Sequence, residues 1–196
     1  LVRAAIRETG GRASVAYIFD PVLSSIELLQ TINSEFGLPC RSVSKRELTA
    51  VLNDYLISQR DEGKRSVVVI DEAQNLRPAV LEQLRLLSNL ETDTEKLLQI
   101  VLLGQPELRG LLERPELAQL SQRLTVRWHI RPLGQEETAD YVRHRLAVAG
   151  AEKVFGDDAL ALVYGASGGV PRMINVVAHR SLLVGYGKGS QIIGAE

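Results

Sequence analysis

Two adjacent carboxylates follow a short apolar run in this sequence, and they are the first candidates for chemistry. Asp71 and Glu72 come directly after Val67–Ile70, a run made only of β-branched residues. Such a run is typical of a central parallel strand, and parallel sheets bind ligands beyond the carboxyl ends of their strands. At that edge one carboxylate can hold a nucleotide's magnesium, and its neighbour can activate a water as general base. An acidic turn after a core strand is the alternative without function.

A glutamine and an arginine stand beside two later apolar runs. Gln105 comes shortly after Leu98–Leu103, where its side chain could orient the same water or contact a γ-phosphate. A helix start before Pro106 is the alternative explanation. Arg123 directly precedes Leu124–Ile130 and carries the planar, permanently charged group that suits phosphate oxygens. Taken alone, Arg123 is better explained as a solvated surface arginine. Three nearby arginines compete for the same role, and they are Arg109, Arg114 and Arg127.

A further arginine, Arg172, follows the segment Gly168–Pro171 at the start of a predicted helix. Proline is favoured in the first turn of a helix because it has no amide hydrogen to satisfy there. A cation in the same turn opposes the helix dipole. We therefore expect an anionic ligand near this helix start, because helix stability alone does not explain Arg172.

The other residues of catalytic or metal-binding type predict no further site. The histidines lack metal-ligand spacing, and the single cysteine has no histidine or second cysteine near it in the sequence. We expect Trp128 in the hydrophobic core. The histidines and the cysteine are His129, His144, His179 and Cys40.

Composition excludes several classes of protein. The 196 residues are 45% hydrophobic and 24% charged, with a net charge of -1, so bulk charge attracts neither nucleic acid nor a membrane surface. A local basic patch stays open. One cysteine forms no internal disulfide and fits a reducing compartment. No apolar run approaches the roughly 18–20 residues that span a bilayer, so we expect a cytoplasmic chain, with any membrane anchor outside it.

Apolar runs that alternate with amphipathic stretches must position these candidates. The alternation predicts βαβ units, and hence a parallel sheet covered by helices. A capping box at Ser44–Glu47, with Val43 and Leu48 at the positions of a hydrophobic staple, predicts one helix start. Helices are predicted from Leu1 to Thr9, from Ile26 to Phe36, from Ser44 to Asp61 and after Pro78. The predicted strands are Ser14–Phe19, Val67–Ile70, Leu98–Leu103 and Leu124–Ile130.

The pattern changes after Arg131. From Gln135 onward only helical patterns occur, at 135–149, 157–164 and 171–185. A boundary near residue 131 therefore divides an α/β core from a small helical lobe. We predict that the core comprises residues 1–131 and the lobe residues 132–196.

Taken together, these motifs resemble the AAA+ ATPases, P-loop NTPases with a three-layer α/β core and a helical lid. The resemblance lies in their order: a strand with Asp-Glu, a strand with Gln, an arginine before a strand, and a lobe with Gly-Val-Pro-Arg. The segments VVVIDEAQNL, LLGQPEL, LSQRL and SGGVPRMINVVAHRSLL are similar to the ExeA/GspA type of secretion ATPase. DEAQ motifs also occur in TniB-type transposition ATPases, so that related type stays open.

The resemblance implies a role for each candidate in the core. Asp71 would hold Mg²⁺ and Glu72 would activate water, as the Walker B pair, and Gln105 would be sensor 1. Arg123 would be the arginine finger that reaches into a neighbouring subunit's site. By analogy with GTPase activation, such a finger is worth roughly 10³–10⁵ in rate. Function would then depend on a homo-oligomer.

The resemblance also implies roles in the lobe. Arg172 would contact the γ-phosphate from the lid, as sensor 2. The adenine would lie near Val170 and Pro171, and near the lobe junction Arg131–Leu133, which contains Pro132. The ligands would be ATP and Mg²⁺.

One motif of the family is absent, because no GxxxxGK[ST] loop occurs in the sequence. In the family this loop follows the first strand, and its amides and lysine hold the phosphates. The chain starts within a helical pattern at Leu1, where such a loop would end. We therefore expect the first strand and the loop ahead of Leu1, with ATP hydrolysis in the intact protein and no activity in this chain alone.

The resemblance finally implies a cellular task. The ATPase would reach the cytoplasmic side of the inner membrane through segments outside this chain. There it would work with membrane-associated proteins to assemble a type II secretion, pilus or exopolysaccharide export apparatus. Two alternatives stay open. One is a DNA-transposition ATPase, which would carry a basic surface and bind DNA less tightly as salt rises. The other is a nucleotide-sensing scaffold that does not hydrolyse ATP.

Overall fold

The structure of the chain is a computed structural model with two compact units, Leu1–Arg127 and Trp128–Glu196. The division falls slightly ahead of the predicted boundary at residue 131. The predicted helix from Leu1 lies outside the described residues, apart from Glu8. The structure describes Glu8, 11–19, Pro21, 23–92, 95–151 and 153–195.

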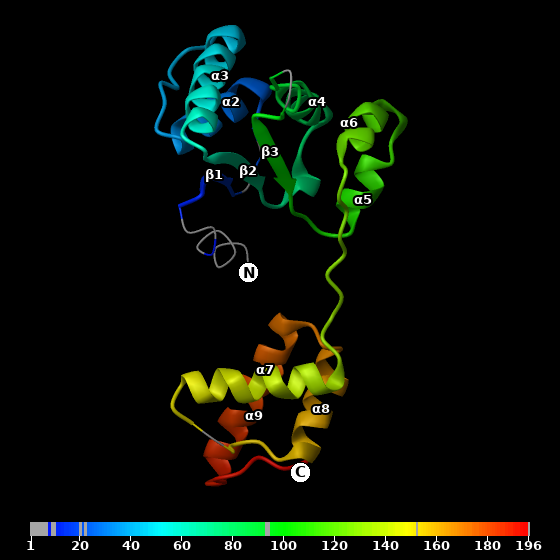
Figure 1. The fold of residues 1–196 in the computed structure, drawn as a ribbon. Helices are drawn as coiled ribbons and strands as arrows, with labels where there is room; N and C mark the ends of the chain where they lie inside the picture. The colour runs from blue at the N-terminus through cyan, green and yellow to red at the C-terminus, as the bar shows by residue number, and fades with distance from the viewer. Residues whose placement is uncertain are drawn as a thin grey trace. The chain divides into compact units, whose positions relative to one another are not determined.

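Three parallel strands form the sheet of the first unit (Figure 1). They lie in the order β1 (Ala13–Ile18), β2 (Arg65–Ile70) and β3 (Leu98–Leu102). The run that precedes Asp71 is therefore the central strand, as its unbroken β-branched sequence predicted. The register aligns the last residues of all three strands. Three of the four predicted strands are thus confirmed, and they end side by side.

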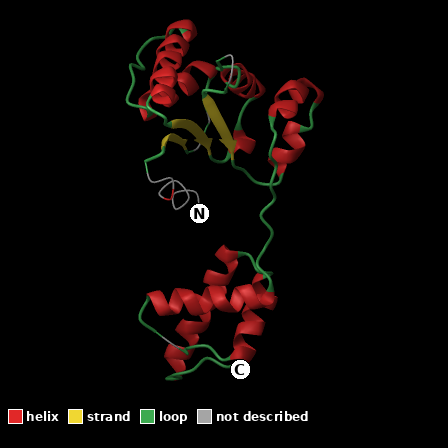
Figure 2. Cartoon of the chain, in the orientation of Figure 1, coloured by secondary structure: helices red, strands yellow, loops and turns green. Residues whose placement is uncertain are grey.

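Helices α2 (Ser25–Glu35), α3 (Lys45–Asp61) and α4 (Pro78–Leu87) cover one face of this sheet (Figure 2). All three confirm predicted helices. In α3 every fourth residue from Leu48 to Leu56 is a buried leucine, and burying one such side chain contributes about 1.5–3 kcal/mol. The apolar stripe predicted from the helical period is therefore what fixes these helices to the sheet.

Two short helices after β3 also belong to the first unit, although no periodic pattern predicted them. α5 (Glu107–Leu112) and α6 (Ala118–Arg123) are six residues long each, too short for a helical period to stand out. A 3-10 turn, Pro115–Leu117, lies between them. Their buried residues Leu112, Leu117 and Leu120 extend the core of the first unit.

The predicted strand Leu124–Ile130 is wrong. The structure has no regular secondary structure there, and Val126 and Trp128 are 82% and 88% exposed, so the expected core position of Trp128 is wrong as well. The alternation of apolar and polar residues is that of a strand, but a strand also needs a hydrogen-bonded neighbour. Among the described residues, β3 pairs only with β2, and this segment pairs with no strand.

The start of α3 matches its predicted signal only in part. The Ser44 hydroxyl accepts a hydrogen bond from the Glu47 amide (3.3 Å). The reciprocal bond of a capping box is absent, because the Glu47 carboxylate accepts from the Ser42 hydroxyl instead (2.6 Å). The Ser44 amide also donates to Ser42 Oγ (3.0 Å), which closes a turn with Val43 at its tip. Val43 is 79% exposed, so the predicted hydrophobic staple is wrong.

A complete capping box stands instead at the start of α2. The Ser24 amide donates to Glu27 Oε2 (2.7 Å), and the Glu27 amide donates to Ser24 Oγ (3.3 Å). The hydrogen bonds from the Ser24 amide and hydroxyl hold the pKa of Glu27 below its usual value. Local pairing thus orients the first helix after β1.

Three helices form the second unit, α7 (Gln135–Val148), α8 (Asp157–Ser167) and α9 (Pro171–Lys188). Each confirms a predicted helix. They pack around a core of their own, so this unit does not depend on the sheet for its apolar contacts. Within the described ranges, no helix is long and apolar enough to cross a bilayer. The buried residues of this core are Val142, Phe155, Ala159, Leu160, Val163 and Ile174.

Candidate functional site

The carboxyl ends of the strands bring the predicted carboxylates and the predicted glutamine to one edge of the sheet. The Asp71 amide donates to the carbonyl oxygen of Ile18 (2.9 Å), and the Leu103 amide donates to that of Ile70 (2.9 Å). These bonds continue the sheet pattern one residue past each strand. The loops that carry the carboxylates and Gln105 therefore start at neighbouring positions.

Asp71 lies half-buried at the end of the central strand and has two hydrogen bonds within the chain. Its Oδ2 accepts from the Tyr17 hydroxyl (2.6 Å), and its Oδ1 accepts from the Glu72 amide (2.9 Å). The hydroxyl comes from β1, on the neighbouring strand. A side-chain hydroxyl and a backbone amide thus fix the orientation of this carboxylate.

A single carboxylate in this position fits Mg²⁺. In proteins Mg²⁺ keeps several waters and binds through one or two carboxylates together with nucleotide phosphates. A carboxylate has about four acceptor positions, so the two donors of Asp71 leave room for a ligand. In the part of the chain that the structure describes, no group of three or more His, Cys, Asp or Glu side chains could hold a metal ion. Asp71 would therefore hold Mg²⁺ together with the nucleotide and water.

Glu72 has an unusual backbone conformation. Its φ of 51° and ψ of 36° lie in the left-handed region, which is uncommon for a residue with a side chain. The 3-10 turn Ala73–Asn75 follows directly, and the Ala73 amide donates to the carbonyl oxygen of Leu103 (2.8 Å). This sharp turn is thus attached to the residue that follows β3.

A glutamine that sequence reasoning did not single out connects this turn to the next strand. Gln74 Nε2 donates to Glu72 Oε2 (2.6 Å), and Gln74 Oε1 accepts from the Gln105 amide (3.1 Å). The Gln105 side chain itself is exposed. The candidate base and the candidate sensor residue are therefore joined through one amide.

Sequence reasoning missed Tyr17 and Gln74 as residues of the site. Tyr17 is a polar aromatic residue within an apolar strand, and Gln74 lies in the motif that supported the family resemblance, but neither signal says which atom the side chain contacts. Both contacts join residues that are far apart in sequence or in different elements. Only the strand register brings them together.

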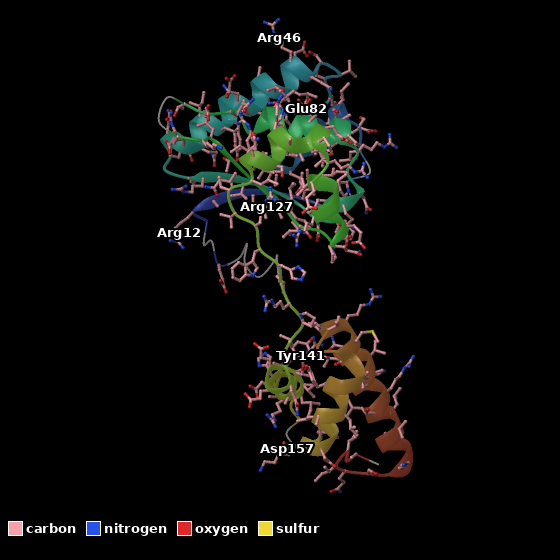
Figure 3. All side chains as sticks on the ribbon, turned by 90° about the vertical axis from the view of Figure 1, so that its right-hand side faces the viewer. Arg12, Arg46, Glu82, Arg127, Tyr141 and Asp157 are labelled. Atoms are coloured by element: carbon pink, nitrogen blue, oxygen red, sulfur yellow. The ribbon has the colours of Figure 1, made fainter. Side chains whose placement is uncertain are left out.

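Arg123 is the last residue of α6 and is partly exposed. Among the described residues no hydrogen bond or ion pair joins it to Asp71 or Glu72. Its neighbour Arg127, labelled in Figure 3, lies on the extended stretch after α6 and donates to Ser121 Oγ (2.6 Å). The structure thus leaves the Arg123 guanidinium outside the hydrogen-bonded group at the sheet edge.

The second unit contains the other predicted residues, at the start of α9. Val170 is the N-cap and Pro171 the first helical residue, and the exposed Arg172 follows in a first turn that has no acidic side chain. The anionic ligand expected near this helix start stays a prediction.

The lobe junction lies against this helix start. The Leu133 amide donates to the carbonyl oxygen of Gly169 (2.9 Å). Gly169 has a φ of 73°, and a Cβ at this position would overlap the carbonyl oxygen of Leu133. Glycine is therefore required for this close approach. It brings Pro132, which is exposed and next to Leu133, toward Val170 within one unit.

Comparison with known proteins gives two matches at the level of sequence. A family model described as "AAA domain" matches residues 2–112. The chain is 45% identical over 193 residues to a protein named general secretion pathway protein A from Aeromonas hydrophila. This alignment covers 97% of the chain and 35% of that relative, so the chain spans about a third of the relative's length.

Solved structures are similar in fold at low sequence identity. Cdc6p from Pyrobaculum aerophilum has a TM-score of 0.68 at 19% identity, covering 98% of this chain and 53% of that one. The Aeropyrum pernix ORC2 protein, solved as ADPNP-ADP complexes, has a TM-score of 0.65 at 16% identity over 98% of this chain and 52% of its own. The Thermotoga maritima RuvB branch migration motor has a TM-score of 0.54 at 18% identity, covering 97% of this chain and 61% of that one. These likenesses confirm the predicted α/β fold class.

Proposed function

The chain belongs to the AAA domain family, with the P-loop α/β fold of the AAA+ proteins and a close likeness to the ExeA/GspA type, as its motifs predicted. On this premise we propose that it is the ATPase module of a secretion protein. It would couple the binding and hydrolysis of ATP to the assembly of a secretion or surface-structure apparatus. The relative's name supports secretion as the setting.

The observation that carries the ATPase proposal is the pair Asp71 and Glu72 at the end of the central strand, with Gln105 at the end of β3. Asp71 has two internal hydrogen bonds that fix its carboxylate for a metal. The Glu72 carboxylate accepts from Gln74 Nε2 through Oε2, and a carboxylate with one such bond has acceptor positions left for the proton of a water. These are the two tasks that nucleotide hydrolysis requires of carboxylates at this edge.

In the proposed reaction the chain supplies binding, orientation and proton transfer. Mg²⁺, when bound, neutralises charge on the β- and γ-phosphate oxygens. Asp71 would hold the Mg²⁺ that accompanies the nucleotide phosphates. The Glu72 carboxylate accepts a proton from the attacking water, and the side chain of Gln105 orients that water or the γ-phosphate.

The remaining candidate residues are proposed to act from a neighbouring subunit or from the second unit of the chain. Arg123 would serve a neighbouring subunit as arginine finger, which makes a homo-oligomer the active form. Residues 132–196 would form a lid, in which Arg172 contacts the γ-phosphate. Val170, Pro171 and Pro132 would line the adenine side, supported by the contact between the lobe junction and the start of α9.

Replacing Glu72 with glutamine in the full-length protein tests the proposal. Turnover should fall about 10²–10⁴-fold, the usual contribution of a general base, because an amide does not accept the proton of the water. ATP binding, measured with a fluorescent analogue, should stay close to the wild type. Glu116→Gln, at an exposed carboxylate in the turn before α6, is the matched control and should keep full turnover.

Three outcomes separate the alternatives. If Glu72→Gln turns over ATP at the wild-type rate, Glu72 is not the base. If the wild type binds ATP without hydrolysing it, the protein is a nucleotide-sensing scaffold. If DNA raises the turnover of the wild type and this effect disappears with added salt, a transposition-type role replaces secretion.

A further inference from the structure

Gln74 occupies the centre of the hydrogen-bonded group at the sheet edge. Its side-chain amide donates to Glu72 Oε2 (2.6 Å) with one end and accepts from the Gln105 backbone amide (3.1 Å) with the other. The two partners define how the amide is turned. The reversed orientation would set oxygen against carboxylate and NH₂ against the Gln105 N–H, and both contacts would be repulsive.

The backbone around Gln74 holds its side chain in this place. The Ala73 amide donates to the carbonyl oxygen of Leu103 (2.8 Å), and the Asn75 amide donates to that of Glu72 (3.0 Å). Ala73 is fully buried. The turn is therefore attached to β3 on one side and to the candidate base on the other.

Gly104 provides the space for this side chain. A Cβ on Gly104 would lie 2.6 Å from Gln74 Oε1 and 3.3 Å from the Gln74 backbone nitrogen. Real Cβ atoms essentially never approach another atom to 2.6 Å, so any larger residue at position 104 would displace the Gln74 amide. Glycine before Gln105 and glutamine at position 74 are thus two halves of one arrangement.

We propose that Gln74 is a positioning residue that couples the orientation of the Glu72 carboxylate to the position of the Gly104–Gln105 backbone. The inference rests on the proposed function for what Glu72 does, but the coupling itself is a property of this chain. When the backbone of Gln105 shifts, the amide of Gln74 shifts with it, and the hydrogen bond carries the shift to Glu72. Contact of Gln105 with a phosphate would in this way set the position of the base.

The coupling predicts a particular kinetic result in the full-length protein. Gln74→Ala should lower kcat by about 10–100-fold, the usual cost of a base that is misplaced by about 1 Å, and should leave the KM for ATP nearly unchanged. Gln74→Glu should have a kcat no higher than that of Gln74→Ala, because a second carboxylate would lie beside Glu72 and repel it. Asn75→Ala, an exposed residue of the same turn, is the matched control and should retain the wild-type kcat.

A double variant tests whether Gly104 and Gln74 act as one unit. Gly104→Ala should also lower kcat, because it displaces Gln74. The double variant Gly104→Ala/Gln74→Ala should be no slower than the slower single variant, within about twofold, since two changes to one interaction are not additive. Losses that multiply would overturn the coupling.

Hydrogen–deuterium exchange of the nucleotide-free protein gives a readout that does not depend on turnover. The Gln105 amide should exchange faster in Gln74→Ala than in the wild type or in Asn75→Ala, because its acceptor has been removed. Thermal unfolding should show all variants folded at the assay temperature. Unchanged exchange at Gln105 would contradict the inference even if kcat falls.

The two proposals fail in different ways. If Glu72→Gln loses turnover while Gln74→Ala keeps the wild-type kcat, the coupling is wrong and the base assignment stands. If Glu72→Gln keeps its turnover, the base assignment is wrong. The exchange of the Gln105 amide then decides alone whether Gln74 holds the two segments together.

Discussion

In the first unit the candidate carboxylates are bonded within the chain, whereas the second unit presents its candidate arginine at an exposed helix start. Asp71 and Glu72 each have side-chain hydrogen bonds from neighbouring residues. Among the described residues, no hydrogen bond or ion pair joins the Arg172 side chain to another residue, and no acidic side chain accompanies it in the first turn of α9. Contacts within the chain therefore orient the candidate carboxylates of the first unit, whereas the candidate arginine of the second unit is exposed to solvent.

The difference has a physical reason. On the proposed roles, a carboxylate that holds a metal and a base that meets one water need fixed geometry. A hydrogen bond from Tyr17 on the neighbouring strand orients Asp71, and one from Gln74 in the same turn orients Glu72. An arginine that contacts phosphate only in the bound state gains from being solvated until then. Arg123 resembles Arg172 in this respect, because it too stands outside the bonded group.

The largest effect that would sharpen this comparison is expected at Arg123. Arg123→Ala in the full-length protein should lower kcat by roughly 10³–10⁵-fold if the residue acts as an arginine finger. Because the finger would serve a neighbouring subunit, mixing Arg123→Ala with Glu72→Gln protein should restore part of the turnover. Arg114→Ala, at an exposed arginine before α6, is the control. Full turnover by Arg123→Ala alone would remove Arg123 from the site.

A smaller effect on turnover is expected from the loss of the hydrogen bond between Tyr17 and Asp71. Tyr17→Phe removes the hydroxyl that donates to Asp71 Oδ2, and the loss of such a supporting bond costs about 10–100-fold in metal affinity or activity. The Mg²⁺ concentration for half-maximal turnover should rise accordingly. Tyr55→Phe is the matched control, since that hydroxyl is also bonded, to Ser14 Oγ (2.6 Å), but away from the site. An unchanged Mg²⁺ requirement in Tyr17→Phe would show that Asp71 is oriented without it.

The smallest effect is a loss of stability in the second unit. Gly169→Ala forces a Cβ onto the carbonyl oxygen of Leu133 at a positive φ, which should lower the free energy of unfolding by about 1–3 kcal/mol. Gly165→Ala, at a position in α8 with open space around it, should be neutral or stabilising by up to about 1 kcal/mol. Denaturant unfolding of both variants measures the difference. Equal stabilities would mean that the junction and α9 are not held together there.

Much of the fold could be predicted from sequence, because most elements are long enough to show their period. The three strands and the helices α2, α3, α4, α7, α8 and α9 all carry apolar residues at regular spacing. Leu124–Ile130 shows the limit of this reasoning, since its alternation suits a strand but the described residues offer it no neighbouring strand. Periodicity describes one segment, whereas pairing depends on two.

For the candidate site, the sequence was likewise enough to predict some features and not others. Position at the carboxyl end of a strand was enough to predict Asp71, Glu72 and Gln105 as neighbours, because parallel strands with aligned ends must present their following residues together. The roles of these residues, and those of Arg123 and Arg172, stay predictions that the experiments above decide.

The sequence by itself predicted the three strands and the longer helices, where the carboxylates lie on them, and to which family the chain belongs. Only the tertiary structure decided which donors orient those carboxylates. Tyr17 and Asp71 are 54 residues apart, and Gln74 and Gln105 are 31 apart. No local pattern encodes such contacts, because hydrogen bonds of about 3 Å form only after the strand register and the turn at Glu72 have fixed the distance between the partners.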